Sequence, residues 1–228
     1  MLRNRIKTLL FSLKIYDRVA QPLRAVYFPY KHFKVRKNAG RVLRELNEIL
    51  SEHTEDYWLA YGTLLGYIRD GGIIRGDIDL DIGLKPSPGS DLAQILKAKG
   101  AYLNRETLVE GRVMLQQFYY QGIDFDLFYY YPVQEGKIQT HIWFPEDYSL
   151  PQKVSYREGK GHLVETTFTD ITTREIRFLG APFRAPVEAG RMLAEHYGED
   201  FMTPDPNWSH DEEISSVVVN KPFEIRFA

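Results

Sequence analysis

The segment Gly76–Gly83, which reads GDIDLDIG, alternates acidic and aliphatic residues with a period of two. Successive side chains of a β-strand point to opposite faces, so this pattern predicts a strand over residues 78–84. One face carries the carboxylates of Asp77, Asp79 and Asp81, and the other buries aliphatic side chains in the core. The chain must therefore fold around a sheet that keeps three neighbouring carboxylates on one face.

Carboxylates this close together repel one another, because each charge disfavours ionisation of the next. A hard divalent cation relieves that repulsion, so we expect Mg²⁺ (or Mn²⁺) held jointly by the carboxylates and by substrate phosphates. The chain has no cysteine, which excludes thiolate metal sites and disulfides. A second interpretation is that the acids only make an exposed strand soluble.

Asp124 and Asp126 form another acidic pair, on a strand predicted later in the chain. If this strand lies beside the first, one of the two carboxylates completes the metal site. Asp79, Asp81 and Asp126 would then suit a two-metal phosphoryl or nucleotidyl transfer. Asp126 would also be placed to receive a proton from an attacking hydroxyl.

Turn residues divide the rest of the chain into helices and strands. The expected helices cover residues 40–51, 63–70, 91–99 and 186–197. The expected strands cover residues 57–61, 112–120, 123–131, 137–144, 162–168 and 175–185, with a hairpin joining the second and third. Residues beyond Met202 are expected to be irregular. This order indicates an α/β or α+β fold, a sheet with helices packed against it.

Gly62 and Thr63 lie between an expected strand and an expected helix, with Thr63 as the candidate helix cap. Backbone N–H groups and the helix dipole at such a junction can receive a phosphate. Arg69 and Arg75 flank two glycines and are candidates for binding phosphate oxygens, with ordinary surface charge as the alternative for each. The candidate substrate-binding residues are Gly62, Thr63, Arg69 and Asp77.

Residues 1–44 carry twelve Lys and Arg against one acid, a charge of +11 within a chain of net charge −2. Aromatic and aliphatic residues are interleaved with these cations, which suits an anionic membrane surface. A solvated helical cap over the core is an equal alternative, and nucleic-acid binding is a weaker one. No apolar run reaches the roughly 18–20 residues of a spanning helix. We expect a cytoplasmic protein that can rest on the inner face of a membrane.

Several motifs resemble the LicD/fukutin family. They are Tyr61–Arg69 (YGTLLGYIR), Gly72-Ile-Ile, Asp77–Gly83 (DIDLDIG) and Asp126-Leu-Phe, followed by weaker matches at Phe178-Leu-Gly, Pro186 and Tyr197-Gly. The resemblance implies a DNA polymerase beta-like nucleotidyltransferase core, a mixed sheet flanked by helices, over residues 41–205. A basic helical segment (residues 1–40) would precede it and a tail (206–228) would follow. Asp79 and Asp81 match the family's metal-binding acids, and Asp126 matches the acid of the neighbouring strand.

The resemblance also implies an activity in polysaccharide biosynthesis. A metal-dependent phosphotransferase would move phosphocholine, ribitol phosphate or glycerol phosphate from a CDP-activated donor to a sugar hydroxyl. The acceptor would be a surface glycan or its lipid-linked oligosaccharide precursor. Arg75-Gly76 stands where the family has Pro-Trp, which bears on the choice of donor or acceptor. One alternative is a true nucleotidyltransferase that delivers NMP from an NTP, and another is a non-catalytic nucleotide- or glycan-binding module.

Overall fold

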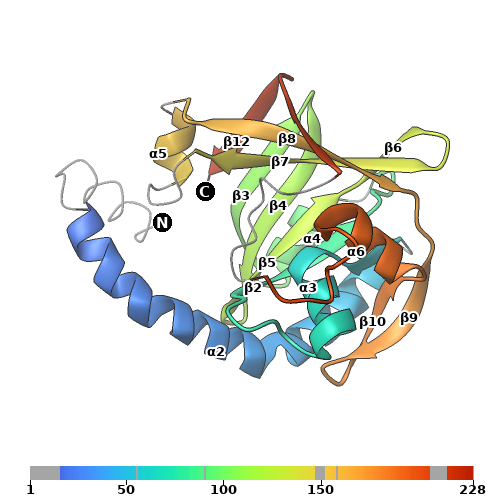
Figure 1. Ribbon diagram of the computed structural model, residues 1–228, viewed down its shortest axis with the longest axis horizontal. Helices are drawn as coiled ribbons and strands as arrows, with labels where there is room; N and C mark the ends of the chain where they lie inside the picture. The colour runs from blue at the N-terminus through green and yellow to red at the C-terminus, as the bar shows by residue number, and fades with distance from the viewer. Residues whose placement is uncertain are drawn as a thin grey trace.

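The computed structural model of the chain describes residues 16–54, 56–89, 91–146, 152–157, 159–205 and 215–227, with side chains from residue 26 onward except at 152–154 (Figure 1). The first part of the basic segment (residues 1–15) and residues 206–214 and 228 of the expected tail lie outside the described residues. Among the helices of the described segments, none has the length and apolar character needed to cross a membrane.

The larger sheet has six strands in the order β1-β2-β5-β4-β3-β12. They are β1 (Tyr57–Leu59), β2 (Asp79–Leu84), β3 (Tyr102–Val109), β4 (Arg112–Tyr120), β5 (Ile123–Tyr129) and β12 (Phe223–Phe227). β2 and β5 run parallel, and the other neighbours are antiparallel. The hairpin between β4 and β5 is confirmed, and it turns at Gln121 and Gly122, which both have positive φ, as a tight two-residue turn requires. The mixed sheet expected from the sequence is therefore present.

A smaller sheet has four strands in the order β11-β8-β7-β6 and lies across the upper part of the larger one (Figure 1). Its strands are β6 (Tyr131–Gln134), β7 (Lys137–Pro145), β8 (Gly161–Thr169) and β11 (Ser216–Val219). The chain after Met202 is therefore not wholly irregular as expected, because β11 joins this sheet and β12 joins the larger one. Both segments carry a strand signal, since β11 contains three consecutive valines and β12 alternates apolar and charged residues (FEIRF). The expectation of an irregular tail followed its Pro, Asp and Asn content and missed this signal.

A separate ribbon is formed by β9 (Thr173–Phe178) and β10 (Ala181–Pro186). The single strand expected over residues 175–185 is wrong, because the chain turns at Leu179 and Gly180, both of which have positive φ. The helix expected to open at Pro186 is also wrong at its start. Pro186 pairs with Thr173 as the last residue of β10, and the helix begins three residues later.

The helical segments are α2 (Tyr16–Ser51), α3 (Tyr61–Leu65), the π-helical turn η1 (Gly66–Asp70), α4 (Leu92–Ala98), α5 (Gln152–Arg157) and α6 (Ala189–Tyr197). α2 runs without a break through residue 40, where the expected basic segment meets the expected catalytic domain. Its last third buries Val42, Leu46 and Leu50 completely in the main core. The helix expected from residue 63 begins at Tyr61, so Thr63 is an interior residue and not its cap.

Candidate active site

The acids of β2 and β5 lie side by side because the two strands are parallel neighbours. Asp79 is opposite Asp124, and Asp81 is opposite Asp126. Neighbouring strands are about 4.8 Å apart, so each pair of carboxylates is within reach of one cation. Leu80 between the two β2 acids is fully buried, as the alternation predicted. The expectation that these strands are neighbours is confirmed.

The row of polar side chains continues across two more strands. Gln117 of β4 is opposite Asp126, and Arg105 of β3 is opposite Gln117. The row Asp81–Asp126–Gln117–Arg105 therefore crosses four strands on one face of the larger sheet. Gln117 Nε2 donates a hydrogen bond of 2.6 Å to Asp126 Oδ2, which fixes the orientation of this carboxylate.

A cavity of about 300 Å³, here called the acid cavity, opens on this row. Its charged wall is made of Asp79, Asp81, Asp126, Gln117 and Arg105. Its apolar wall comes from β7 of the smaller sheet and consists of Ile142, Trp143, Phe144 and Pro145. The remaining lining comes from α3 (Tyr61 and Gly62), β4 (Leu115), β5 (Phe128) and the end of α6 (Tyr197). A ligand in this cavity therefore meets carboxylates on one side and aromatic rings on the other.

The start of α3 is held directly against the acidic strand. The Asp81 N–H donates a hydrogen bond of 2.8 Å to Thr63 Oγ1, and the Asp81 carbonyl accepts one of 3.0 Å from the Ala60 N–H. Thr63 is only 2% exposed, so its hydroxyl positions Asp81 and does not face the cavity. The sequence-based assignment of Thr63 to direct substrate contact has no support in this arrangement.

Gly62 lies close to two carboxylates. A Cβ atom at this position would lie 3.1 Å from Asp77 Oδ2 and 3.4 Å from Asp81 Oδ2. A side chain at residue 62 would therefore crowd the Asp77 carboxylate, which would have to shift by a few tenths of an ångström. Asp77 precedes β2 but still converges on the same point as Asp81, as the alternating pattern predicted.

Burial and mutual repulsion raise the pKa values of these carboxyl groups. Burial raises the pKa of Asp126 to about 7, with a further rise from the Asp79 charge, while the Gln117 hydrogen bond and the Arg105 charge oppose it. Burial raises the pKa of Asp77 to about 6, and the Asp79 charge adds to this effect. The pKa of Asp81 is raised well above its usual range by burial and by the charges of Asp79, Asp126 and Asp77.

The donor chemistry of the charged wall fits a divalent cation. Within the described residues, no three acidic or histidine side chains form a ready-made metal cluster. The three facing groups are nevertheless all carboxylates, the ligands that Mg²⁺ and Mn²⁺ prefer. Burial and mutual repulsion raise the pKa values of these carboxyl groups, and a bound cation would offset both effects.

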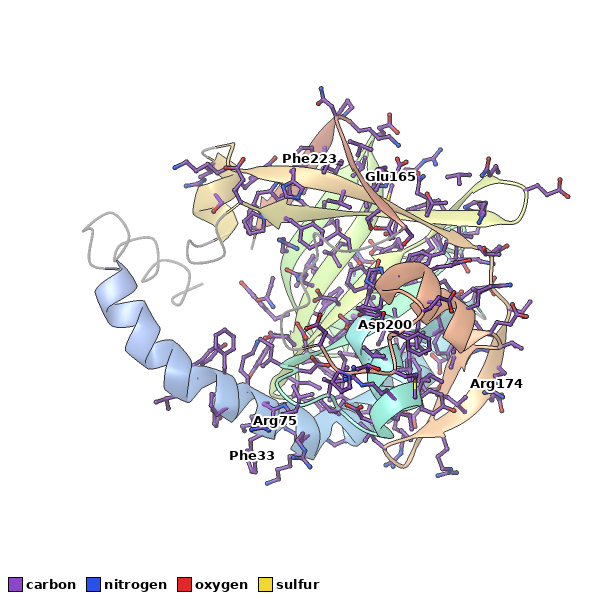
Figure 2. The ribbon with its side chains drawn as sticks, in the orientation of Figure 1. Phe33, Arg75, Glu165, Arg174, Asp200 and Phe223 are labelled. Carbon is purple, nitrogen blue, oxygen red and sulfur yellow. The ribbon has the colours of Figure 1, made fainter. Side chains whose placement is uncertain are left out.

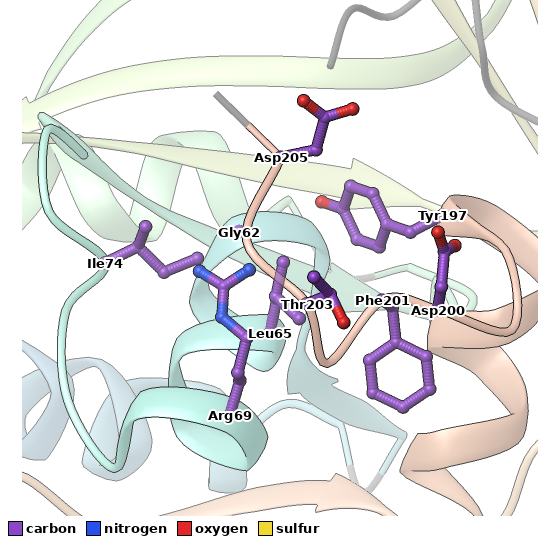
Figure 3. A pocket seen from close by; sticks show the side chains of 9 residues that line it. All are labelled: Gly62, Leu65, Arg69, Ile74, Tyr197, Asp200, Phe201, Thr203 and Asp205. Carbon is purple, nitrogen blue, oxygen red and sulfur yellow. The ribbon is translucent and has the colours of Figure 1, made fainter. Parts of the chain in front are cut away.

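A second cavity of about 280 Å³, here called the Arg69 cavity, adjoins the first at Gly62 and Tyr197, which line both. Its other lining residues are Leu65, Arg69, Ile74, Asp200, Phe201, Thr203 and Asp205. Figure 3 shows the Arg69 guanidinium group extending into this cavity towards Gly62. Asp70 orients it through a 2.8 Å contact between Arg69 Nε and Asp70 Oδ1. Arg75 is exposed and lines neither cavity.

The protein-family model described as "LicD/FKTN/FKRP, nucleotidyltransferase domain" matches residues 55–186, more than half of the chain. The chain belongs to this family. The match includes β2, α3 and β5, the elements that carry Gly62, Asp79, Asp81 and Asp126. Family membership and the mixed sheet together confirm the expected nucleotidyltransferase-type fold.

Two curated relatives are uncharacterized proteins of Rickettsia. RP689 of Rickettsia prowazekii (strain Madrid E) is 41% identical over 56 residues, and RT0683 of Rickettsia typhi (strain ATCC VR-144 / Wilmington) is 39% identical over 56 residues. Each alignment covers 25% of this chain but only 21% and 18% of the respective relative. Among solved structures, the lincomycin-bound lincosamide antibiotic adenylyltransferase LnuA matches with 14% identity and a TM-score of 0.36, over 64% of this chain and 84% of that one.

Several residues of this LicD-family site were not predicted from the sequence. Arg105 and Gln117 belong to no motif, and only the strand register brings them to Asp126. The N-terminal helix also reaches the site: Lys31 Nζ forms an ion pair with Asp124 Oδ2, and His32 Nδ1 lies 2.9 Å from the Asp77 carbonyl oxygen. The long separation in sequence between these partners left no local signal of either contact.

Proposed function

We propose that the chain is a divalent-metal-dependent phosphotransferase. Its donor is a CDP-activated alcohol carrying phosphocholine, ribitol phosphate or glycerol phosphate, and its acceptor is a sugar hydroxyl of a surface glycan or lipid-linked oligosaccharide precursor. The reaction takes place on the cytoplasmic side of a membrane. The observation that carries the proposal is the convergence of Asp79, Asp81 and Asp126 on one cavity, against the glycine of a strand-to-helix junction.

Asp79, Asp81 and Asp126 would hold Mg²⁺ or Mn²⁺, which when bound stabilises the charge that develops on the phosphate oxygens. In our proposal the attacking hydroxyl oxygen forms a new bond to the phosphorus nearest the alcohol. The bond from this phosphorus to the bridging oxygen breaks, and CMP leaves with the electron pair. Asp126 receives the hydroxyl proton, and the Gln117 hydrogen bond holds its carboxylate in position for this role.

The two cavities divide the substrate contacts. Arg69, which extends towards Gly62 from its own cavity, binds a donor phosphate oxygen together with the backbone at Gly62. The acceptor hydroxyl approaches from the Asp126 side, where Gln117 holds the carboxylate in place. The aromatic wall formed by Trp143 and Phe144 supports the base or a sugar ring of a substrate.

The test is a thermal-shift screen of CDP-choline, CDP-ribitol, CDP-glycerol, CTP and GDP-mannose, each with Mg²⁺ and with EDTA. We expect stabilisation by one CDP-alcohol only in the presence of Mg²⁺, because a ligand that binds the folded state raises Tm. The Asp79→Asn and Asp81→Asn variants should lose this response. Asp56→Asn is the matched control. Asp56 is exposed and directly precedes β1, whose first residue pairs with Leu84 at the end of β2 that is farther from Asp79 and Asp81.

The same screen, followed by an assay of the reaction products, separates the alternatives. Stabilisation by CTP alone, with diphosphate as product, would replace this proposal with nucleotidyl transfer. Ligand binding that persists without turnover and survives in Asp79→Asn would indicate a binding module. Turnover of a CDP-alcohol with release of CMP would support the transferase and identify its donor.

A further inference from the structure

The N-terminal half of α2 extends beyond the body of the molecule (Figure 1). Side chains on it are described from Val26 onward, and several large apolar ones are exposed. Val26 is 72% exposed, Tyr30 55% and Phe33 59%. Figure 2 shows Phe33 on the side of α2 that faces away from the sheets.

These residues lie on one continuous stripe of the helix. Residues 26, 30, 33, 37, 41 and 44 fall within an arc of about 80°, because an α-helix turns about 100° per residue. All six side chains of this outer stripe are exposed: Val26, Tyr30, Phe33, Lys37, Arg41 and Arg44. The stripe is about 27 Å long at 1.5 Å per residue. Its first half is apolar and its second half is basic.

The charge of this part of the helix is entirely positive. Residues 18–44 contain eight Lys and Arg and no Asp or Glu. Lys34 lies with Nζ 5.5 Å from the centre of the Tyr30 ring, so a cation also lies beside the apolar half. Lys and Arg near an anionic lipid surface contribute about 1 kcal/mol each, and exposed aromatic rings suit the headgroup region.

The opposite face of the same helix is fixed to the catalytic body. Val35 and Ala39 are fully buried in the main core. Lys31 pairs with Asp124 beside the acid cavity, and His32 contacts the backbone of Asp77. A surface that binds the outer stripe therefore sets the orientation of the whole site relative to that surface.

We propose that the outer stripe of α2 binds the surface of an anionic phospholipid bilayer. A second copy of the chain fits less well, because a two-fold contact along the whole stripe would place its basic half either against the basic half or against the apolar half of the other copy. Nucleic acid would match the cations, but it offers no apolar layer for Val26 and the ring of Phe33. The inference does not depend on the proposed reaction, because it concerns a surface outside both cavities.

Vesicle co-sedimentation of the full chain tests this proposal. The probes are vesicles of phosphatidylcholine alone and of phosphatidylcholine mixed with phosphatidylglycerol. We expect binding only to the anionic vesicles, with loss at high salt because the charges are screened. The double variant Tyr30→Glu/Phe33→Glu should bind at least tenfold more weakly, and Lys37→Gln and Arg41→Gln about fivefold more weakly each.

The matched control is Val217→Glu/Val218→Glu, which places the same charges on apolar residues of β11 that are 59% and 69% exposed. It should bind vesicles like the unchanged chain.

Equal binding by both double variants, equal binding to neutral vesicles, or no binding to any vesicle would overturn the proposal. Binding to an RNA oligonucleotide at lower concentration than to vesicles, or self-association lost in Tyr30→Glu/Phe33→Glu, would replace it with those partners. The thermal response to a CDP-alcohol should persist in Tyr30→Glu/Phe33→Glu, so failure here and failure of the proposed reaction are distinguishable.

Discussion

The two walls of the acid cavity come from different sheets and differ in chemistry. The larger sheet contributes a row of charged and polar groups from Asp81 to Arg105, set by the register of four strands. Among the described residues, the smaller sheet contributes Trp143 and Phe144 from β7 and no ionisable group to the lining. One wall therefore offers carboxylates to a cation, and the other offers an apolar, aromatic surface.

Under the proposed function, the polar wall serves catalysis and the apolar wall serves selectivity. Changes in the polar row should affect the rate and the metal response, whereas changes in the apolar wall should affect which substrate binds. Variants in each wall, and in the contacts that hold the two sheets together, test whether that separation is real.

The largest effect is expected for Asp81→Asn. The variant removes a carboxylate that would hold the cation, so the transfer rate should fall about a thousandfold or more. The Tm of the metal-free protein should stay constant or rise, because the substitution also removes repulsion with Asp79 and Asp126. Transfer assays and thermal melts in EDTA measure the two effects. A fall in rate accompanied by a matching loss of stability would instead indicate misfolding, and Asp56→Asn should change neither.

A smaller effect is expected for Phe144→Leu in the apolar wall. Loss of an aromatic contact with a bound substrate costs about 0.5–1.5 kcal/mol, so KM for one substrate should rise about two- to tenfold. The kcat value and the Mg²⁺ response should change little. The control is Phe118→Leu, which alters a buried ring that stacks on Phe125 outside the cavity. A large fall in kcat in Phe144→Leu would contradict the separation of the two walls.

The pH dependence of stability tests the polar row without substrate. The pKa of Asp126 is about 7 in the folded protein, against about 3.9 in an unfolded chain. Between these values the folded state binds more protons, so the metal-free protein should lose stability as pH rises from about 4 to about 7. Urea unfolding in EDTA at several pH values measures this slope. Asp126→Asn should flatten it, and an unchanged slope in that variant would assign the effect to other groups.

The smallest effect is expected for Lys221→Met. Lys221, between β11 and β12, forms an ion pair with Glu165 of β8, whose Oε2 also lies 3.0 Å from His141 Nε2. The substitution should lower the free energy of unfolding by about 1 kcal/mol and leave the metal response unchanged. Arg226→Met removes a more exposed cation, which pairs with Glu224 and, at 3.4 Å, with Glu106, and it should have still less effect. A changed metal response in Lys221→Met would show that the smaller sheet influences the polar row.

The charged wall was largely predictable from the sequence. The alternation at residues 77–83 defined the acidic strand, and the turn at residues 121–122 defined the hairpin that delivers Asp126. Both signals are local, because side-chain alternation and turn preferences act over a few residues. The family motif coincides with the same segments.

The apolar wall and the far half of the polar row were not predictable in this way. Arg105 lies on β3, a strand that mixes polar and apolar residues without strict alternation, and it joins the row only through pairing with β4. Trp143 and Phe144 lie on an expected strand, but their place opposite the acids depends on how one sheet packs over another. The first half of α2 is basic in sequence, but its composition did not indicate which of its side chains would form the exposed face of the helix.

The parallel contact between β2 and β5 also determines when the active site exists during folding. Asp81 and Asp126 are 45 positions apart (126 − 81), and the connection between them passes through α4, β3 and β4. The β3–β4 and β4–β5 hairpins close short loops and are expected early, whereas closing the longer connection is slower. The carboxylates of the two strands thus meet only when β2 has paired with β5. A nascent or truncated chain that ends before β5 presents the acids of β2 without their partner, so under the proposed function a cation would stabilise the sheet only after these two strands have paired.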